Sequence, residues 1–318
     1  MLLSHSTTII GEAPMELKLI QENVYYIPHV TNIGIIKTGD SAILIDSSVD
    51  DDTARKILKL LENHHLQPKA IINTHFHADH CGGNAYIKNK TNATIYAPEI
   101  EADFIQHPYL QPFVMFSGAD PPKDLQNKLL MQAPSKVDHV IKSEEKLLQI
   151  EGIEVEIVRL PGHSPNQIGI GTGNVLFCAD SIFSLEILAK HKIPYLCDVG
   201  KQQETLTTLK TIKNKHVVPS HGEPTRDVTQ MVDAYTKFIE ETETYLTRLL
   251  SEEKRTDQIL KALCEHYQVE IKLNNQYFLM NTITLAYLSH LRNKGQLTLQ
   301  FKENILYWKT TTHQNASD

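Results

Sequence analysis

The sequence predicts an α+β protein with a large N-terminal domain and a small C-terminal one. Short apolar segments with the pattern of buried strands recur as far as residue 218. Segments with apolar residues at helical spacing lie between and after them. From residue 246 onward the sequence predicts two helices followed by a β-hairpin. We therefore expect domains at 1–245, with an insertion at about 101–135, and at 246–318.

The first predicted unit is a strand, a helix and a second strand between residues 42 and 73. The run 42–45 is continuously apolar, as expected for a buried strand, and it ends at Asp46. The acidic run 50–52 favours a helix N-terminus. Apolar side chains at helical spacing follow it at Ala54, Ile57, Leu58 and Leu61. The next strand, from Ala70, leads directly to a group of histidines.

Three more predicted strands also end at a histidine or an aspartate. Residues 153–157 alternate between apolar and acidic side chains and precede Pro161-Gly162-His163. The run 175–178 leads to Asp180, and Val217-Val218 leads to His221. Because such side chains can meet at one edge of a sheet, we expect residues far apart in sequence to form one site there.

The overall composition limits the class of protein. A chain of 318 residues with 41% hydrophobic residues can bury a full core, and no apolar run reaches the roughly 18 residues of a membrane span. The opening residues do not resemble a signal peptide, so we expect a cytoplasmic protein. The four cysteines include no C-x-x-C pair and indicate free thiols. The net charge of −7 disfavours a broad polyanion-binding surface.

The segment Thr74-His75-Phe76-His77-Ala78-Asp79-His80 indicates a metalloenzyme. Neutral imidazole and carboxylate are the usual ligands of zinc and similar divalent ions. Four such groups on one turn would be costly to place together without a cation. His163, Asp180 and His221 complete a candidate set of seven ligands.

This set resembles the metallo-β-lactamase-fold hydrolase superfamily. The pattern is His75-x-His77-x-Asp79-His80, then Pro-Gly-His163, Asp180 and Ser-His221-Gly, and the resemblance spans roughly residues 16–235. It implies a four-layer αββα sandwich and a dinuclear site, as in the glyoxalase II, lactonase and endoribonuclease branches. One ion would be bound by His75, His77 and His163 and the other by Asp79, His80 and His221, with Asp180 as the bridge. The β-lactam-hydrolysing branch commonly has a cysteine ligand near the bridging position, which disfavours that activity here.

The resemblance implies hydrolysis by a metal-bound hydroxide. Two divalent ions, most simply zinc but with iron or manganese also compatible, would acidify a shared water, which would attack a small ester, thioester or lactone. Asp79 and Asp180 are the candidate catalytic residues. Asp180 would bridge the two ions, and Asp79 could also transfer a proton. Asp46 and Thr74 are expected to form hydrogen bonds with the ligand histidines on the side of the ring away from the metal, although Asp46 could equally be a strand-end cap.

Smaller features around the motif have structural interpretations. Gly82-Gly83 should let the chain leave the metal loop through backbone angles that other residues resist. Cys81 is expected to be a buried filler rather than a reactive thiol. The segment 101–134 is rich in proline and aromatic residues, so it cannot be one helix, and it could be a lid, a substrate wall or a structural flap.

Six side chains are candidates for the substrate pocket. Three belong to the insertion and three to the loop 181–197: Phe113, Met115, Phe116, Phe183, His191 and Tyr195. The residues of the loop 181–197 differ from those at the corresponding positions of related enzymes. Glyoxalase II has a Lys and a Tyr after the bridging Asp where this chain has Ala189, Lys190 and His191. N-acyl-homoserine lactonases have a Tyr where Phe183 stands.

The C-terminal segment predicts a module of a different kind. A long amphipathic helix over 228–249 leads to a helix from Thr256, a helix that Gly295 closes, and strands at 297–301 and 305–308. This order resembles a winged helix, which also occurs in the endoribonuclease branch. Residues 251–318 hold eight basic and seven acidic residues, well short of a basic stripe. We therefore expect a structural cap or dimer arm first, with Arg292, Lys294 and Lys302 as the possible nucleic-acid contacts.

Several functions remain open at this stage. The preferred partner is a small-molecule substrate. An endoribonuclease or other phosphodiesterase is the first alternative. Less favoured are a mononuclear iron persulfide dioxygenase that uses His75, His163 and Asp180, and a metal-binding sensor without turnover. No membrane partner is expected, and a homodimer is open.

Overall fold

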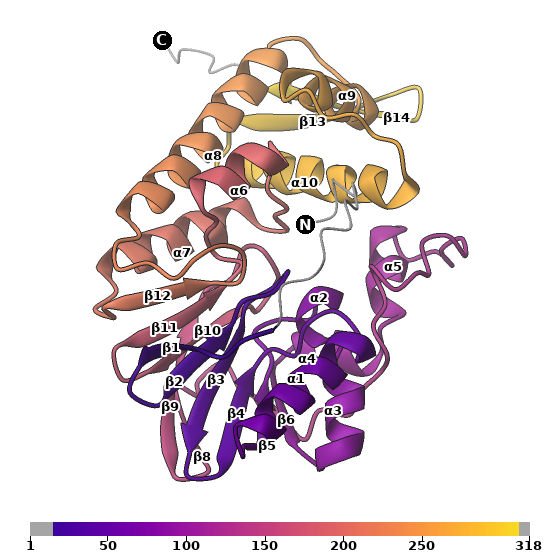
Figure 1. Cartoon of the computed structure of the whole chain (residues 1–318). Coiled ribbons are helices and arrows are strands. Elements are labelled where there is room, and N and C mark those ends of the chain that lie inside the picture. Colours follow the sequence, from indigo (N-terminus) through magenta and orange to yellow (C-terminus); the bar gives the residue numbers. More distant parts are fainter. Residues whose placement is uncertain (1–14, 312–318) are drawn as a thin grey trace.

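Two β-sheets lie face to face between two layers of helices (Figure 1). The computed structural model describes residues 15–311. Seven strands form the first sheet in chain order: β1 (Lys18–Gln21), β2 (Val24–Ile27), β3 (Ile33–Thr38), β4 (Ser41–Ile45), β5 (Gln67–Ile72), β6 (Thr94–Pro98) and β7 (His139–Ile141). Strands β1 to β4 are antiparallel, and β4 to β7 are parallel.

The second sheet has five strands in the order β12-β11-β10-β9-β8. They are β8 (Leu147–Ile150), β9 (Ile153–Arg159), β10 (Ile168–Thr172), β11 (Val175–Ala179) and β12 (His216–Pro219). Only the pair of β11 and β12 is parallel. The first sheet carries α1 (Asp51–Asn63) and α3 (Asn84–Thr91) on its outer face, and α7 (Val199–Thr211) and α8 (Thr229–Leu249) cover the second (Figure 1). This is the αββα sandwich that the sequence predicted.

Each layer boundary has its own apolar core, and this explains the composition of the strands. In β4, Leu44 packs towards α1, while Ile43 and Ile45 pack between the two sheets. A strand that is buried on both faces must be apolar throughout, which is why residues 42–45 show no alternation. In β9, by contrast, Val155 and Ile157 are buried, and Glu154 and Glu156, which alternate with them, face solvent.

The predicted elements of the N-terminal region are present. The predicted helix is α1, and the Asp50 side chain accepts a hydrogen bond from the Thr53 backbone N–H at 2.9 Å, as an N-cap does. Strands β1 to β3, β6 to β8 and β10, and helices α6 (Leu185–His191) and α7, were not predicted. Helix α7 contains many threonines and few apolar residues, so it lacks a clear apolar stripe.

The insertion is broken into short elements, as its prolines predicted. It begins with α4 (Glu101–Gln106) and α5 (Leu110–Met115) and continues in turns. Met115, Leu125 and Leu130 pack against Leu279 of α10 (Asn274–Asn293). The insertion and the C-terminal region therefore meet above the sheets (Figure 1).

The C-terminal residues contain the predicted helices and hairpin. They are α9 (Thr256–His266), α10, β13 (Leu297–Lys302) and β14 (Ile305–Thr310), and Lys254 and Trp308 exchange two backbone hydrogen bonds beside the hairpin. Helix α8 runs through the boundary expected at residue 245, and one apolar cluster joins Tyr235 of α8 to Leu260 and Tyr287. A separate winged-helix domain therefore stays a proposal.

One prediction about the ends of the chain falls outside the described residues, because the absence of a signal peptide concerns residues 1–14. Within 15–311, every helix is too short or too polar to cross a membrane.

The reason given above for Gly82 and Gly83 is wrong, because both residues have ordinary right-handed helical angles. Glycine is needed there for space. A Cβ on Gly82 would lie 2.1 Å from the Val49 carbonyl oxygen, and one on Gly83 would lie 2.3 Å from the Ser47 carbonyl oxygen. The turn after the histidine segment thus packs directly onto the backbone that follows β4.

We expect Gly82→Ala to lower the free energy of unfolding by about 3 kcal/mol, because the added methyl group would force two backbones apart. Urea denaturation measures this change. The comparison is Gly39→Ala, whose Cβ would meet nothing within 4 Å and whose φ of +55° costs about 1 kcal/mol. Equal losses in the two variants would contradict the packing argument.

Candidate metal centre

The ends of four strands bring the seven predicted ligands to one place. The segment after β5 carries His75 and His77, and α2 (Ala78–Cys81) carries Asp79 and His80. The other three ligands follow β9, β11 and β12: they are His163, Asp180 and His221. Both sheets therefore contribute ligands at the carboxyl ends of their strands.

The first group consists of His75, His77 and His163. Nδ1 of His77 lies 3.1 Å from Nε2 of His75 and 2.9 Å from Nε2 of His163. In a tetrahedral zinc site with bonds of about 2.0 Å, two ligand atoms lie about 3.3 Å apart. The spacing of the three nitrogens fits one such ion.

The second group consists of Asp79, His80 and His221, and Asp180 lies between the two groups. Oδ2 of Asp79 is 4.0 Å from Nε2 of His80 and 3.7 Å from Nε2 of His221. Oδ1 of Asp180 is 3.4 Å from His80 Nε2, while its Oδ2 is 3.4 Å from both His163 and His221 Nε2. One carboxylate thus faces members of both groups, as a bridging ligand must.

Unpaired polar atoms give an independent test of whether cations fit. Within the described residues, Nε2 of His80, Oδ1 of Asp180 and Nε2 of His221 are buried without a hydrogen-bond partner. Leaving buried polar atoms unpaired is costly. All three atoms point at the same space, so divalent cations there would satisfy them together.

Hydrogen bonds at the far side of four rings orient the ligand nitrogens. His80 donates through Nδ1 to Oδ2 of Asp46 at 2.8 Å. His163 and His221 donate through Nδ1 to the backbone carbonyls of Tyr195, at 3.1 Å, and of Val30, at 2.8 Å. These bonds fix the tautomer in which Nε2 carries the free lone pair.

Asp46 and Thr74 have the supporting positions that the sequence predicted. The Thr74 hydroxyl donates to Asp46 Oδ2 at 2.8 Å, so its oxygen is left to accept from Nδ1 of His75 at 3.0 Å. The Thr74 backbone N–H donates to Oδ1 of the same carboxylate at 2.8 Å. Asp46 therefore holds a ligand of each group, His80 directly and His75 through Thr74.

Burial and charge set the protonation of the site. Burial, together with the neighbouring imidazoles, lowers the pKa of His75 and of His77 well below the usual value, and burial lowers the pKa of His163 to about 4. These three rings are neutral at pH 7, which is the form that binds metals. Burial also disfavours the charged form of His80, but Asp180 and the other nearby carboxylates raise its pKa.

The strands end in unusual backbone conformations. Gly162, just before His163, has a φ of +133°, and a Cβ there would lie 2.6 Å from Cα of Gln202. Asp46 and Ala179 also have positive φ, at 63° and 53°. Strain of this kind persists where the surrounding structure over-determines it, often at functional sites.

Glu101 is a residue of the site that the sequence did not indicate. Its carboxylate is fully buried and accepts hydrogen bonds from the Phe76 N–H at 3.1 Å, the Ser164 hydroxyl at 2.8 Å and the Asn166 N–H at 2.8 Å. Burial raises the pKa of Glu101 to about 7, although these donors act in the opposite direction. Glu101 joins the loop of His75 and His77 to the loop of His163. A lone glutamate at the start of a helix gave no signal of this role.

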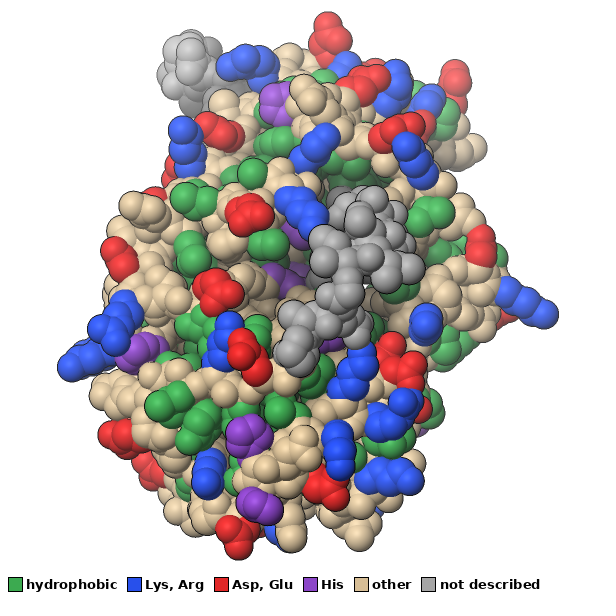
Figure 2. Space-filling view, viewed as in Figure 1, with side chains coloured by type: hydrophobic (Ala, Val, Ile, Leu, Met, Phe, Trp, Pro, Cys, Tyr) green, Lys and Arg blue, Asp and Glu red, His purple; other side chains and the backbone are tan. Residues whose placement is uncertain are grey.

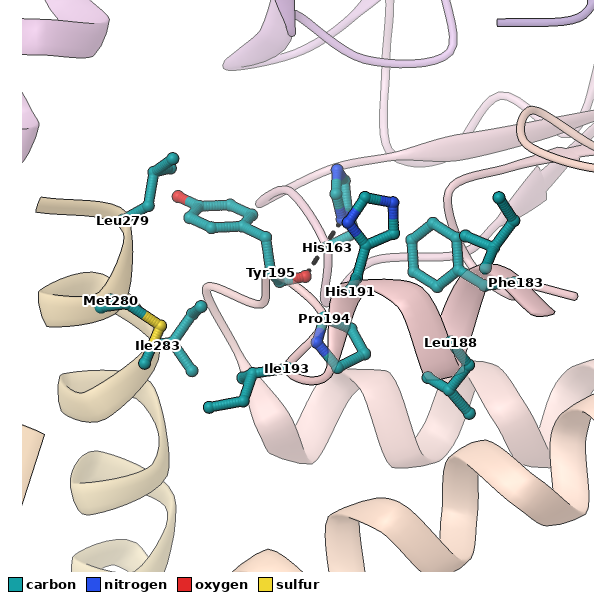
Figure 3. Close-up of a pocket in the computed structure, with 11 residues that line it drawn as sticks. His163, Phe183, Leu188, His191, Ile193, Pro194, Tyr195, Leu279, Met280 and Ile283 are labelled. Carbon is teal, nitrogen blue, oxygen red and sulfur yellow. Dashed lines mark hydrogen bonds between the residues drawn. The ribbon is translucent and has the colours of Figure 1, made fainter. Parts of the chain in front are cut away.

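A cavity of about 280 Å³ opens beside the ligands. Asp79, His163 and Asp180 form part of its wall. Most other lining residues are apolar or come from the insertion and α10: Val30, Val49, Ala78, Gln111, Lys128, Leu129, Tyr195 and Leu279. A smaller cavity of about 40 Å³ adjoins it, and Phe183, His191 and Tyr195 are among the side chains that line it (Figure 3).

Three of the predicted pocket residues need correction. Met115 and Phe116 pack with Leu279 and Phe278 of α10 instead of lining the larger cavity, and Phe113 lies against Tyr109. The insertion reaches the cavity through other residues, namely Gln111, Lys128 and Leu129. Of these three side chains, Met115 and Phe116 serve the packing of the insertion against α10.

Comparison with known proteins agrees with this geometry. The family model described as "Metallo-beta-lactamase superfamily" matches residues 26–221. A hydroxyacylglutathione hydrolase of Serratia proteamaculans is 28% identical over 43% of this chain and 42% of its own length. The chain thus spans less than half of that relative. A probable metallo-hydrolase of Bacillus subtilis, YqgX, is 25% identical over 66% of this chain and 88% of its own.

A solved structure extends the likeness of the fold to the C-terminal residues. A β-lactamase domain protein from Burkholderia ambifaria superposes with a TM-score of 0.74 and covers 96% of this chain and 97% of its own. At 16% identity this comparison bears on the fold alone.

We expect Asp46→Asn to weaken metal binding by about 10–100-fold, because the variant disturbs the support of His80 and Thr74. Competition with a chromophoric zinc chelator measures the affinity. The control is Asp52→Asn, whose side chain is 75% exposed on α1. An unchanged affinity in Asp46→Asn would show that Asp46 does not organise the ligands.

We expect Glu101→Ala to lower the free energy of unfolding by about 3 kcal/mol, because three donors would lose their acceptor, two of them backbone N–H groups. Chemical denaturation measures the loss. Glu99→Ala, in the same turn but with a side chain 34% exposed, should cost less than about 1 kcal/mol. Equal losses would contradict the bridging role of Glu101.

Proposed function

The chain belongs to the metallo-beta-lactamase superfamily, and from that premise we propose that it is a dinuclear metal-dependent hydrolase of a small ester, thioester or lactone. His75, His77 and His163 would hold one divalent ion and Asp79, His80 and His221 the other, with Asp180 between them; zinc suits this set. The observation that carries the proposal is that the Asp180 carboxylate faces both ligand groups where the cavity opens.

Each catalytic group has a definite task in this proposal. Bound ions would supply an acidified water and a Lewis acid for the carbonyl oxygen of the substrate. Asp79 has a side chain 26% exposed and lines the cavity, so its carboxylate can orient a water and pass a proton to the leaving group. Asp180 is almost fully buried and serves to hold the two ligand groups together.

The cavity supports a small acyl substrate. Its volume of about 280 Å³ is just below the range of about 300–1,000 Å³ that is typical of small-molecule sites. Val49, Leu129 and Leu279 make much of its wall apolar, while Gln111 and Lys128 add polar groups. The name of the hydroxyacylglutathione hydrolase relatives supports acyl hydrolysis as the reaction class.

Phosphodiester cleavage is the second candidate. Lys128 favours it, because an ammonium group at the cavity can face a phosphate. The surface argues against a long nucleic-acid partner, since Figure 2 shows basic side chains interspersed with acidic ones and no basic stripe on this face. The net charge of −7 has the same implication.

The test is an assay of the zinc-loaded chain against thioesters, lactones and single-stranded RNA, with metal content measured in parallel. We expect two ions per chain and hydrolysis of an acyl substrate. Asp180→Ala should lower kcat/KM by more than about 100-fold, because a loss of several kcal/mol of transition-state stabilisation has that effect.

Asp52→Ala serves as the control and should keep full activity, since its carboxylate lies on the exposed face of α1. Cleavage of RNA without any acyl hydrolysis would reverse the order of the two candidates. One iron per chain would instead favour the mononuclear dioxygenase. Equal activity in Asp180→Ala would place the reaction outside this site.

A further inference from the structure

The small cavity next to the metal ligands is a side pocket of the larger one. The two share three lining residues, His163, Tyr195 and Leu279. The His163 ring, whose Nε2 faces the ligand group, thus forms part of the wall of both (Figure 3). A group bound in the side pocket would therefore contact the His163 ring, whose Nε2 faces the other candidate metal ligands.

The wall of the side pocket is mostly apolar. Helix α6 contributes Ile187 and Leu188, and α10 contributes Leu279, Met280 and Ile283. Phe183, Ile193, Pro194 and Tyr195 complete the apolar part (Figure 3).

The two histidines of the lining offer no charge. Nδ1 of His163 is engaged by the Tyr195 carbonyl. Burial lowers the pKa of His191 to about 4, so this ring is neutral at pH 7. A charged substrate group would lose its hydration in this pocket without an opposite charge to compensate it.

The size of the pocket limits its occupant. A water-sized group needs about 10–15 Å³, so the volume of about 40 Å³ takes about three such groups. That corresponds to a chain of about three or four carbon atoms. The larger cavity, with Gln111 and Lys128 in its wall, has room for a bigger and more polar group.

We propose that the pocket between α6 and α10 is an acyl subsite, which binds the short unbranched alkyl chain of the substrate's acyl group while the larger cavity binds the leaving group. The acyl chain is bonded directly to the carbonyl carbon, and this pocket is a mostly apolar space whose wall includes the ring of the candidate ligand His163. The inference rests on the proposed function and narrows its substrate class to esters, thioesters or lactones of short aliphatic acids.

The activity test uses the full zinc-loaded chain and thioesters of acetic to octanoic acid with one common leaving group. Each buried methylene should raise kcat/KM by about fourfold up to pentanoyl, with no further rise beyond it. Leu188→Trp and Ile283→Phe, which fill the pocket from opposite walls, should remove this rise and leave the acetyl rate within twofold. Two independent substitutions are used so that the test still works if one of the variants fails to fold.

Each filling has a matched control on the same helix. Leu185→Trp on α6 and Leu285→Phe on α10 add similar bulk at positions that are 48% and 42% exposed, and neither residue lines the pocket. Both controls should keep the dependence on chain length. A flat chain-length profile in the unmodified chain, or a rise that persists in both filled variants, would overturn the proposal.

A binding test separates this inference from the proposed function. Calorimetry with acetate, butanoate and pentanoate on the zinc-loaded chain should show affinity that increases with chain length, and the increase should vanish in the filled variants. This result without any acyl turnover would refute the hydrolase proposal but leave the subsite. Turnover with equal affinity for all three carboxylates would leave the hydrolase and refute the subsite. A chain-length effect seen only for the alcohol or thiol side would refute the acyl assignment.

Discussion

The hydrogen bonds of Asp46 are the interaction on which the metal centre depends. This carboxylate stands at the end of a strand that is buried on both faces, and it reaches His80 at 2.8 Å and His75 through the Thr74 hydroxyl. It therefore ties a ligand from each group to the same point of the first sheet. Because the rings are fixed from behind, their lone pairs converge on one space even though they come from different segments. The packing of Gly82 and Gly83 against the backbone after β4 serves the same alignment.

The candidate site contains energetically unfavourable features, and the packing of the whole sandwich offsets them. Three buried polar atoms of the candidate site, Nε2 of His80, Oδ1 of Asp180 and Nε2 of His221, lack hydrogen-bond partners, and several strands end at residues with positive φ. Both features are unfavourable taken alone. The three apolar cores of the sandwich supply the stability that tolerates them, since they hold both sheets and their helices in fixed relation. Glu101 adds a polar link by joining the loop of His75 and His77 to the loop of His163.

The C-terminal residues contribute to the site as well as to the packing. Leu279 of α10 lines both cavities, and the same residue packs with Met115 and Leu130 of the insertion. The larger cavity is thus formed jointly by the sandwich, the insertion and α10. In the proposed function, α10 would therefore contribute to the selection of the substrate. In the insertion, Met115 and Phe116 pack against α10, while Gln111, Lys128 and Leu129 line the larger cavity.

The sequence by itself determined the types of the candidate ligands and the strands that carry them, because local patterns encode both: apolar runs predict strands, and His75 to His80 include metal-binding residue types at short spacing. It also indicated Asp46 and Thr74, which lie beside those patterns. Only the tertiary structure revealed Glu101, the packing reason for Gly82 and Gly83, and the true walls of the cavities. These depend on contacts between segments far apart in the sequence, such as Glu101 with Asn166 and Leu130 with Leu279, and no local pattern records them. A side chain's chemistry can be read from its neighbours in the chain, whereas its surroundings are set by packing across the fold.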